Sequence, residues 1–502
     1  MLLDDLPVLP IILPLVAAPV CLLLPNGRIA GAWASLVAWL ALAAAIQLLG
    51  VVAATGTVEY ALGGWAAPLG IVYRVDLAGA IVMTLVAAMA SVTFPYAIES
   101  AREEIIRSQM SGFFAMFLIC LAGLMGVVAT GDAFNVFVFL EISSLSTYTL
   151  VAMGATRDRR ALTAAFTYLV LGTIGATFFV IGLGLLYQVT GTLNMVDIHE
   201  KMTGMDNRVV RAGYAFILTG LALKLAMFPL HRWLPAAYTY APSPVTAFLA
   251  STSTKVAIYA MLRFLFTVFG FGFSFADVAL TTFLILGLVG MVVASLIAIF
   301  REDVKMILAY SSVAQIGYML LGISFATPLG VAAALVHVVN HAVMKASLFM
   351  AVGAVFFALG SHRLPVYRGL MKTMPVTAIA FLVGGLSLVG VPLTAGFVSK
   401  WVLIQAAFDS VLQVPSLIIV LMIVASSLLA VAYVGRMAWA ILLAEPLPGV
   451  EPKPVPRLML APMLLMAALN IYLGVNADAL VALCQSAADV LLDSGLGYGG
   501  AR

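Results

Sequence analysis

Ionisable side chains stand inside long apolar segments of this sequence, where they could carry protons or ions. Glu141 is the lone acid of the apolar run from Ala133 to Leu150. A charged side chain at the centre of a membrane helix costs roughly 2.5–3.5 kcal/mol on insertion scales, and folding a helix does not require it. The same setting recurs at Lys224, Lys255, Lys345 and Lys400. These residues predict that the chain moves protons or ions through its membrane helices.

Lys224 lies too deep in its apolar segment to extend easily to either membrane surface. Burial favours the neutral amine, whereas a nearby carboxylate favours the ammonium. We expect Glu141 to be that carboxylate, so that making and breaking the pair switches the lysine between its two states. The alternative interpretation is a static ion pair that fixes the packing of two helices.

Hydroxyl side chains stand next to Lys255, at Ser251, Thr252 and Thr254. They can hold water beside the ammonium, and we expect them to support a hydrated path. Alternatively, the hydroxyls donate to carbonyls of their own helix and carry no further meaning.

A stripe of titratable side chains is predicted on one helix. His337, His341 and Lys345 are spaced by four residues and therefore share a face. Histidine titrates near neutral pH and can pass a proton either way, and Asn340 is expected to support it. A zincin would carry Glu directly after the first histidine, but Val338 stands there, and no third ligand is obvious. The pattern favours a proton relay and no metal site.

Proline interrupts two predicted helices at corresponding places in the two halves. Pro229 follows Lys224 by five residues, and Pro392 precedes Lys400 by eight. Proline removes a backbone donor, and the freed carbonyls are tolerated at membrane depth only beside protein or a wet cavity. Paired broken helices indicate inverted repeats with hinges and sites near the membrane midplane. The alternatives are ordinary proline kinks and, because Trp401 follows Lys400, an interfacial position for that lysine.

The composition identifies an all-α integral membrane protein. Hydrophobic residues make up 64% of the chain and charged residues 9%, against about 25% charged in soluble domains. Apolar runs are near the length that spans a bilayer, and they lack the alternation of a barrel. The acidic start of the chain argues against a cleaved signal peptide.

Other function classes are disfavoured by what the sequence contains. The three cysteines, Cys21, Cys120 and Cys484, form no CxxC pair, which argues against an iron–sulfur cluster or zinc knuckle. No basic tract indicates nucleic acid, and no cofactor is expected. Asp76 and Asp132 are weak candidates for a cation site, because no carboxylate cluster surrounds them.

About 14 membrane helices are predicted from the lengths and breaks of the apolar runs. Their expected ranges are 7–25, 31–54, 76–98, 110–129, 133–154, 161–189, 212–240, 244–269, 276–300, 304–324, 328–359, 375–405, 413–443 and 456–480. An even number places both termini on one side. Arginine and lysine are concentrated in the loops of the opposite side, so the positive-inside rule predicts that both termini lie outside.

Five motifs together resemble a known family. They are Gly131 to Glu141, Lys224 to Pro235 followed by Ala241 to Ala247 and Lys255, Asp303 to Tyr318, His337 to Phe349, and Pro392 to Lys400. From about residue 110 to residue 440 the chain resembles the antiporter-like membrane subunits of respiratory complex I and of the multisubunit Mrp cation/proton antiporters.

The resemblance implies 14 helices with two inverted five-helix repeats and two discontinuous helices. The implied units are 1–109 with helices 1–3, 110–270 with the first repeat, 271–443 with the second, and 444–502 with helix 14 and the tail. It also implies a central polar axis that carries protons, with His231 in support. In the family, the pair corresponding to Glu141 and Lys224 is thought to respond to the neighbouring subunit.

Within this family, the resemblance leaves two possible subunit types. The M-type subunit of complex I carries an acid where Lys400 stands, which leaves the D-type subunit of Mrp antiporters and the N-type subunit of complex I. The phrase from Val136 to Glu141 and the chain length favour the Mrp D-type, whereas Ile142 to Tyr148 is more N-like.

The leading hypothesis is therefore a subunit of a sodium (or other monovalent cation)/proton antiporter, a secondary transporter rather than an enzyme. It would lie in the bilayer of the inner (cytoplasmic) membrane among other membrane subunits. The alternative is the proton-pumping arm of an NADH-quinone oxidoreductase or a related redox complex, without its own redox centre. A subunit coupled to inorganic carbon uptake is a third possibility, and a pure scaffold is the least favoured.

Overall fold

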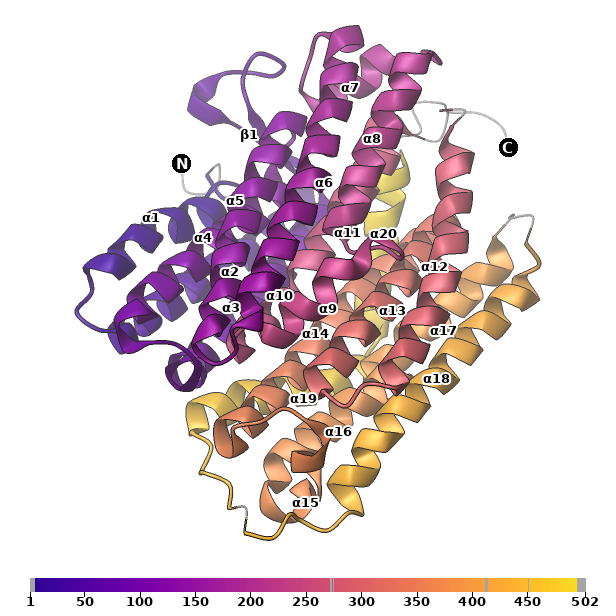
Figure 1. Cartoon of the computed structure of the whole chain (residues 1–502). Coiled ribbons are helices and arrows are strands. Elements are labelled where there is room, and N and C mark those ends of the chain that lie inside the picture. Colours follow the sequence, from indigo (N-terminus) through magenta and orange to yellow (C-terminus); the bar gives the residue numbers. More distant parts are fainter. Residues whose placement is uncertain (1–4, 271–272, 274, 411–413, 450, 494–502) are drawn as a thin grey trace.

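The computed structural model describes residues 5–270, 273, 275–410, 414–449 and 451–493, which form a bundle of membrane helices (Figure 1). The helices are α1 (Leu9–Leu23), α2 (Gly27–Thr55), α3 (Leu77–Glu104), α4 (Met110–Ala129), α5 (Ala133–Ala152), α6 (Arg160–Thr190), α7 (Met195–Met202), α8 (Arg208–Lys224), α9 (Trp233–Tyr240), α10 (Ser243–Ser251), α11 (Ser253–Leu262), α12 (Ala276–Ile299), α13 (Val304–Ser324), α14 (Pro328–Leu359), α15 (Leu370–Thr373), α16 (Pro375–Val389), α17 (Ala395–Asp409), α18 (Ser416–Leu442), α19 (Arg457–Val475) and α20 (Asp478–Asp493). The strands are β1 (Val58–Ala61) and β2 (Val72–Val75).

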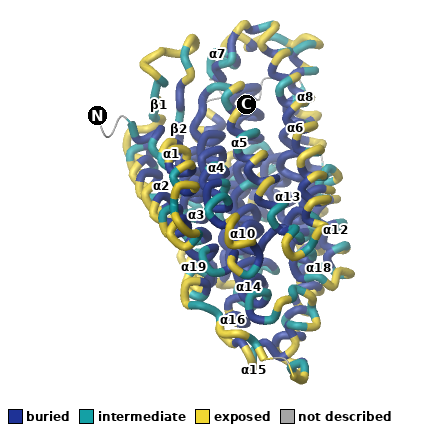
Figure 2. The backbone as a smooth tube through the Cα atoms, turned by 60° about the vertical axis from the view of Figure 1, so that its left-hand side comes forward, coloured by how far each residue is buried: buried dark blue, intermediate teal, exposed yellow. Residues whose placement is uncertain are grey.

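Within the described residues, eleven helical stretches are long and apolar enough to cross a membrane, and α1 and α16 are shorter apolar helices. The chain is therefore a multi-pass integral membrane protein. Figure 2 shows that α4 and α14 are buried in the interior, whereas α2, α12 and α18 expose residues outward. Those exposed residues are largely apolar, as expected for surfaces that face lipid.

The two ends of the bundle differ. The start of α1 and the end of α20 lie toward the end that also carries β1 and α7, and α15 lies at the opposite end (Figure 1). The helix α14 runs through the centre and packs against α10, α13, α16, α17, α19 and α20. This long central helix connects the parts of the bundle in which the predicted site residues lie.

The polar stretch 55–75 contains a hairpin. The strands β1 and β2 pair antiparallel, with Glu59 opposite Arg74 and an ion pair of 2.8 Å between their side chains. Both strands contain valine and tyrosine, residue types that favour extended backbone. Each strand is only four residues long, too short for the sequence pattern to predict it.

The expected range 456–480 for the last membrane helix is wrong at its C-terminal end. The helix α19 stops at Val475, and α20 begins at Asp478 and packs against α14. A side chain at Gly474 would lie 2.4 Å from the backbone of Leu393 and Thr394. This glycine therefore lets α19 end in close contact with the segment between α16 and α17.

A buried ion pair ties α3 to the helix that follows α11. Both terminal nitrogens of Arg263 donate to the carboxylate of Asp76 at 2.7 Å, and one of them also donates to the hydroxyl of Tyr259 at 2.6 Å. Asp76 in addition accepts from the backbone N–H of Gly79 and so caps α3. Its oxygens are thus occupied by donors within the protein.

Asp132, the other weak candidate for a cation site, also caps a helix. Its carboxylate accepts from the backbone N–H of Asn135 at 2.7 Å and caps α5. The capping role accounts for an acid at this position without a cation.

Replacing Asp76 with asparagine is expected to destabilise the protein by about 3–5 kcal/mol, because it leaves Arg263 charged, buried and unpaired. The measurement is the thermal unfolding midpoint of the purified complex in detergent. Glu59→Gln, which breaks an ion pair between exposed side chains, is the matched control and should cost no more than about 1 kcal/mol. Equal midpoints for the two variants would contradict this prediction.

Candidate functional site

The predicted partners Glu141 and Lys224 form an ion pair. Lys224 is the last residue of α8, and its Nζ donates to Oε1 of Glu141 at 2.9 Å and to Oγ of Ser144 at 2.8 Å. Lys224 is buried, whereas the side chain of Glu141 keeps 22% of its surface exposed. The pair joins α5 to the point at which α8 ends.

The backbone around this lysine is broken as the prolines predict. After α8, Ala226 has a positive φ of 60°, and helical structure resumes only after Pro229. The indole N–H of Trp233 donates to the carbonyl of Leu223 at 2.9 Å and satisfies one of the freed acceptors. The break therefore holds the end of α8, with its lysine, inside the protein.

A third break, which was not predicted, positions Lys255. The expected continuous helix 244–269 is interrupted at Thr252, whose backbone (φ −125°, ψ −62°) separates α10 from α11. The Nζ of Lys255 donates to the carbonyl of Ala250 beside the break, and to Oγ1 of Thr254 at 3.3 Å. No proline or glycine marks this position, and only the run of hydroxyl residues could have indicated it.

The hydroxyl groups near Lys255 divide into two kinds. Ser251 and Thr252 donate to carbonyls one turn earlier in their own helix, at 2.7 Å in each case. These two therefore match the alternative in which the hydroxyls bond back to their own helix, and the hydrated path beside Lys255 stays a prediction. Of the three, only Thr254 contacts the lysine.

The three titratable residues of α14 lie on one face, as their spacing predicts. The Nζ of Lys345 donates to the carbonyl of Leu308 at 2.7 Å and to Oγ of Ser311 at 2.5 Å, both on α13. The rings of His337 and His341 are parallel, with centroids 5.9 Å apart. All three side chains are buried.

The histidine nitrogens are only partly satisfied by protein. Nδ1 of His337 is 2.9 Å from Oγ of Ser399, whereas its Nε2 and both ring nitrogens of His341 have no hydrogen-bond partner among the described residues. Buried polar atoms are nearly always paired with protein or water. These nitrogens are therefore free to exchange protons with water that reaches them.

Lys400 lies at the second proline break. Its Nζ donates to the carbonyls of Leu388 at 3.2 Å and Val389 at 2.8 Å, and to Oγ of Ser427 at 3.0 Å. Those carbonyls end α16, so the negative end of that helix faces the ammonium. Lys400 is buried while Trp401 points outward, so the ammonium does not reach the protein surface on which Trp401 lies.

Two further residues of the predicted set have clear positions. Nδ2 of Asn340 donates to the carbonyl of Ala395 at 2.7 Å and ties α14 to the first residue of α17. The ring of His231 stacks on Phe228, and its Nδ1 has no partner among the described residues. Asn340 thus supports the second break, whereas His231 lies in the first.

We refer to the ionisable side chains of this set, Glu141, Lys224, Lys255, His337, His341, Lys345 and Lys400, as the polar line. Its members come from α5, α8, α11, α14 and α17, and all but Glu141 are buried. In the described residues, no three His, Cys, Asp or Glu side chains converge in a way that could hold a metal ion. The arrangement can transfer protons between lysines, histidines and one carboxylate when water connects them.

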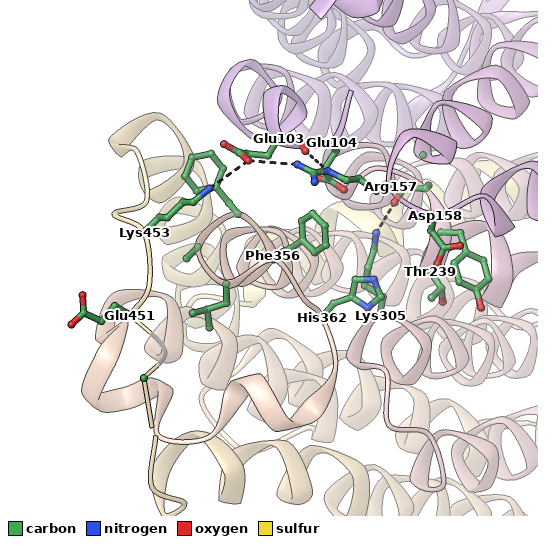
Figure 3. Close-up of a pocket in the computed structure, with 18 residues that line it drawn as sticks. Glu103, Glu104, Arg157, Asp158, Thr239, Lys305, Phe356, His362, Glu451 and Lys453 are labelled. Atoms are coloured by element: carbon green, nitrogen blue, oxygen red, sulfur yellow. Dashed lines mark hydrogen bonds and ion pairs between the residues drawn. The ribbon is translucent and has the colours of Figure 1, made fainter. Parts of the chain in front are cut away.

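The sequence interpretation missed a charged pocket at the end of the bundle that carries α15. The pocket has a volume of about 670 Å³, and Figure 3 shows the charged residues Glu103, Glu104, Arg157, Lys305 and Lys453 in its lining. Glu104 and Lys305 are buried, although Glu104 lies between the expected helices 76–98 and 110–129 and Lys305 lies at the start of the expected helix 304–324. Their position inside the bundle depends on helix packing that a single sequence does not display.

Comparison with known proteins gives the family. The family described as NADH:quinone oxidoreductase/Mrp antiporter, transmembrane, matches residues 130–430. The N-type subunit of the NADH-quinone oxidoreductase of Desulforudis audaxviator is 40% identical over 455 residues, which cover 87% of this chain and 88% of that protein. The D-type subunit of the Na⁺/H⁺ antiporter of Alkalihalophilus pseudofirmus is 34% identical over 348 residues, 69% of each chain.

The fold agrees with a solved member of the same group. A chain of the Mrp complex from Dietzia superposes with a TM-score of 0.90 at 27% identity, over 99% of this chain and 100% of that one. The matched segment 130–430 contains Glu141, all four lysines of the polar line and both histidines. This chain belongs to the NADH:quinone oxidoreductase/Mrp antiporter family of membrane subunits.

Proposed function

We propose that this chain is the proton-translocating subunit of a multisubunit membrane complex. Protons step along the buried polar line, whose members are Glu141, Lys224, Lys255, His337, His341, Lys345 and Lys400. The main observation behind this proposal concerns the four lysines. In the described residues, only Lys224 has a carboxylate within ion-pair distance, whereas the other three donate to neutral oxygens. A lysine held by neutral oxygens can exist with or without its proton, as a relay requires.

The position of Glu141 supports a neighbouring subunit. On α5 it lies on the same face as Val138 and Leu145, which are exposed apolar residues. A carboxylate at a lipid-facing surface would be costly. We infer that another membrane subunit covers this face, so that its own charges can strengthen or weaken the pair between Glu141 and Lys224.

The proposed architecture has fourteen crossings in two inverted five-helix repeats, over 110–270 and 271–443, preceded by 1–109 and followed by 444–502. The corresponding breaks between α8 and α9 and between α16 and α17 support it. Pro229 and Pro392 act as the hinges. In the proposed orientation the end that carries α15 faces the cytoplasm and both termini lie outside the inner membrane.

The first candidate for the complete complex is an Mrp-type antiporter that exchanges protons for sodium or another monovalent cation, with this chain as the D-like subunit. The 34% identity with a D-type antiporter subunit and the superposition on a chain of an Mrp complex support it. The second candidate is an N-type subunit of a redox-driven pump, which the 40% identity with an N-type subunit of an NADH-quinone oxidoreductase supports.

The discriminating experiment is gentle affinity purification of this subunit from its native membrane, with the partners identified by mass spectrometry. Several small hydrophobic subunits and one larger relative, without redox proteins, are expected for an antiporter. Iron–sulfur and flavin or nickel proteins would identify a redox pump and overturn the antiport assignment. Recovery of the chain without membrane partners would contradict the multisubunit proposal itself.

A further inference from the structure

We propose that the charged pocket at the α15 end takes up protons and passes them to Lys345 along a buried polar face of α3. This inference rests on the proposed function, because it supplies the line of lysines with protons. The residues of this route are Glu104, Ser100 and Tyr96 of α3 and Ser243 of α10. None of these residues belongs to the polar line described above.

The rim of the pocket holds charges of both signs near water. Glu103 lies 3.6 Å from Arg157 and 3.7 Å from Lys453, and all three side chains are at least one-third exposed (Figure 3). Asp158, also in the lining, accepts hydrogen bonds from Arg160, and these bonds hold the pKa of that carboxyl below its usual value. The rim thus presents side chains of both signs to water.

Glu104 lies at the floor of the pocket, with only 6% of its surface exposed. Its two oxygens accept from the backbone N–H of Ser243, each at 3.0 Å. The nearby Lys305 donates instead to the carbonyl of Ala241 at 2.6 Å. Glu104 is therefore a buried carboxylate without a bonded cation among the described residues, which suits a group that gains and loses a proton.

Below the pocket, α3 carries a polar face into the bundle. Tyr96, Ser100 and Glu104 are four residues apart and share one side of the helix. The hydroxyl of Tyr96 donates to the carbonyl of Met350 on α14 at 2.9 Å. Oγ of Ser100, which is 1% exposed, has no hydrogen-bond partner among the described residues.

Helices α3, α10 and α14 meet closely at Tyr96, Ser243 and Gly353. A side chain at Gly353 of α14 would lie 2.2 Å from the hydroxyl of Tyr96 and 2.8 Å from Cβ of Ser243. Oγ of Ser243 also lacks a partner within the described part of the chain. The glycine thus brings two buried hydroxyl residues against the helix that carries Lys345.

From this meeting point α14 leads to the polar line. Lys345, Phe349 and Gly353 are four residues apart on one face, so the helical rise from Gly353 to Lys345 is about 12 Å. The ring of Phe349 fills this interval, with its centroid 5.8 Å from Nζ of Lys345. Phe349 separates the two polar regions, and its displacement would let water connect them.

A purely structural role would explain Glu104 but not the hydroxyls. Glu104 caps the start of α10 and faces the charge of Lys305, both of which stabilise packing. Among the described residues, neither Oγ of Ser100 nor Oγ of Ser243 forms a hydrogen bond that ties two helices together, so packing alone does not require a hydroxyl at these positions. In the proposed route, these hydroxyls bond to water and pass protons from Glu104 toward α14.

The test measures proton translocation by the whole complex in proteoliposomes with an internal pH-sensitive dye. We expect Ser100→Ala to lower the rate several-fold and Glu104→Gln to lower it by about 10²-fold, the scale of a positioned acid or base. Ser100→Ala should leave the thermal unfolding midpoint unchanged or raised, because it removes an unpaired buried group.

The controls lie outside the proposed route. Ser91→Ala removes a hydroxyl of α3 that is already bound to the carbonyl of Ala88, and Glu59→Gln removes a charge from an exposed ion pair on the hairpin, away from this pocket. Both should translocate at the native rate. A native rate in Ser100→Ala or in correctly assembled Glu104→Gln would overturn the proposal, and so would an equal loss in the controls.

Lys224→Ala separates this inference from the proposed function. If Lys224→Ala is inactive while Ser100→Ala and Glu104→Gln are normal, the line of lysines stands and the route along α3 is wrong. If Lys224→Ala is itself fully active, the proposed function fails first. Should Glu104→Gln prevent assembly, Ser100→Ala decides the route alone.

Discussion

Lys224→Ala and Glu141→Ala are each expected to abolish proton translocation, by about 10²-fold or more, while the complex still assembles. Either substitution removes one partner of the 2.9 Å pair that joins α5 to the end of α8. The remaining group then has no partner with which to exchange a proton. The measurement is proton translocation by the reconstituted complex, with its subunit composition checked by mass spectrometry.

The control is Lys201→Ala, which removes a lysine on the exposed part of α7 whose partner is Asp197. It should translocate at the native rate. Native rates in Lys224→Ala or Glu141→Ala would exclude the pair from the relay, and disassembly of both variants would point instead to a role in packing.

Lys345→Met should separate transport from stability. Lys345 is fully buried, and among the described residues its Nζ donates only to neutral acceptors, the carbonyl of Leu308 and the hydroxyl of Ser311. Methionine fills a similar volume without a group that needs solvation. We therefore expect translocation to fall by about 10²-fold while the thermal unfolding midpoint stays level or rises.

Lys372→Met provides the comparison, because Lys372 is exposed on α15. That variant should change neither translocation nor the unfolding midpoint. A lower midpoint together with native translocation in Lys345→Met would show that this lysine serves the fold and not the relay.

The ionisable residues of the site could be identified from the sequence because they stand where lipid-facing helices exclude charge. The pairing of Glu141 with Lys224 was likewise predictable, because a buried ammonium without a carboxylate partner is costly. The breaks at Pro229 and Pro392 followed from the missing backbone donor of proline. These features depend on single residues and their nearest surroundings.

What the sequence did not reveal depends on contacts between distant segments. The break at Thr252 has no proline, and its cause is local competition by hydroxyl groups for backbone carbonyls. The oxygens that hold Lys345 and Lys400 belong to other helices, α13 for one and α16 and α18 for the other. No spacing rule within one helix predicts such partners.

Glu104 shows the same limit at the pocket. In the sequence it resembles a charge at the end of a helix, next to Arg102 and Glu103. Only the packing of α3 against α10 places its carboxylate on the backbone of Ser243 and away from water. The distinction between a surface charge and a buried one therefore came from tertiary structure.

The most direct measurement of the relay is proton translocation by the complex that carries Lys224→Arg. Arginine can keep the ion pair with Glu141 but does not release its proton in proteins. If Lys224 passes protons, this variant should assemble fully and translocate at the background rate of Lys224→Ala. Translocation at the native rate by Lys224→Arg would contradict the relay and show that the pair is only structural.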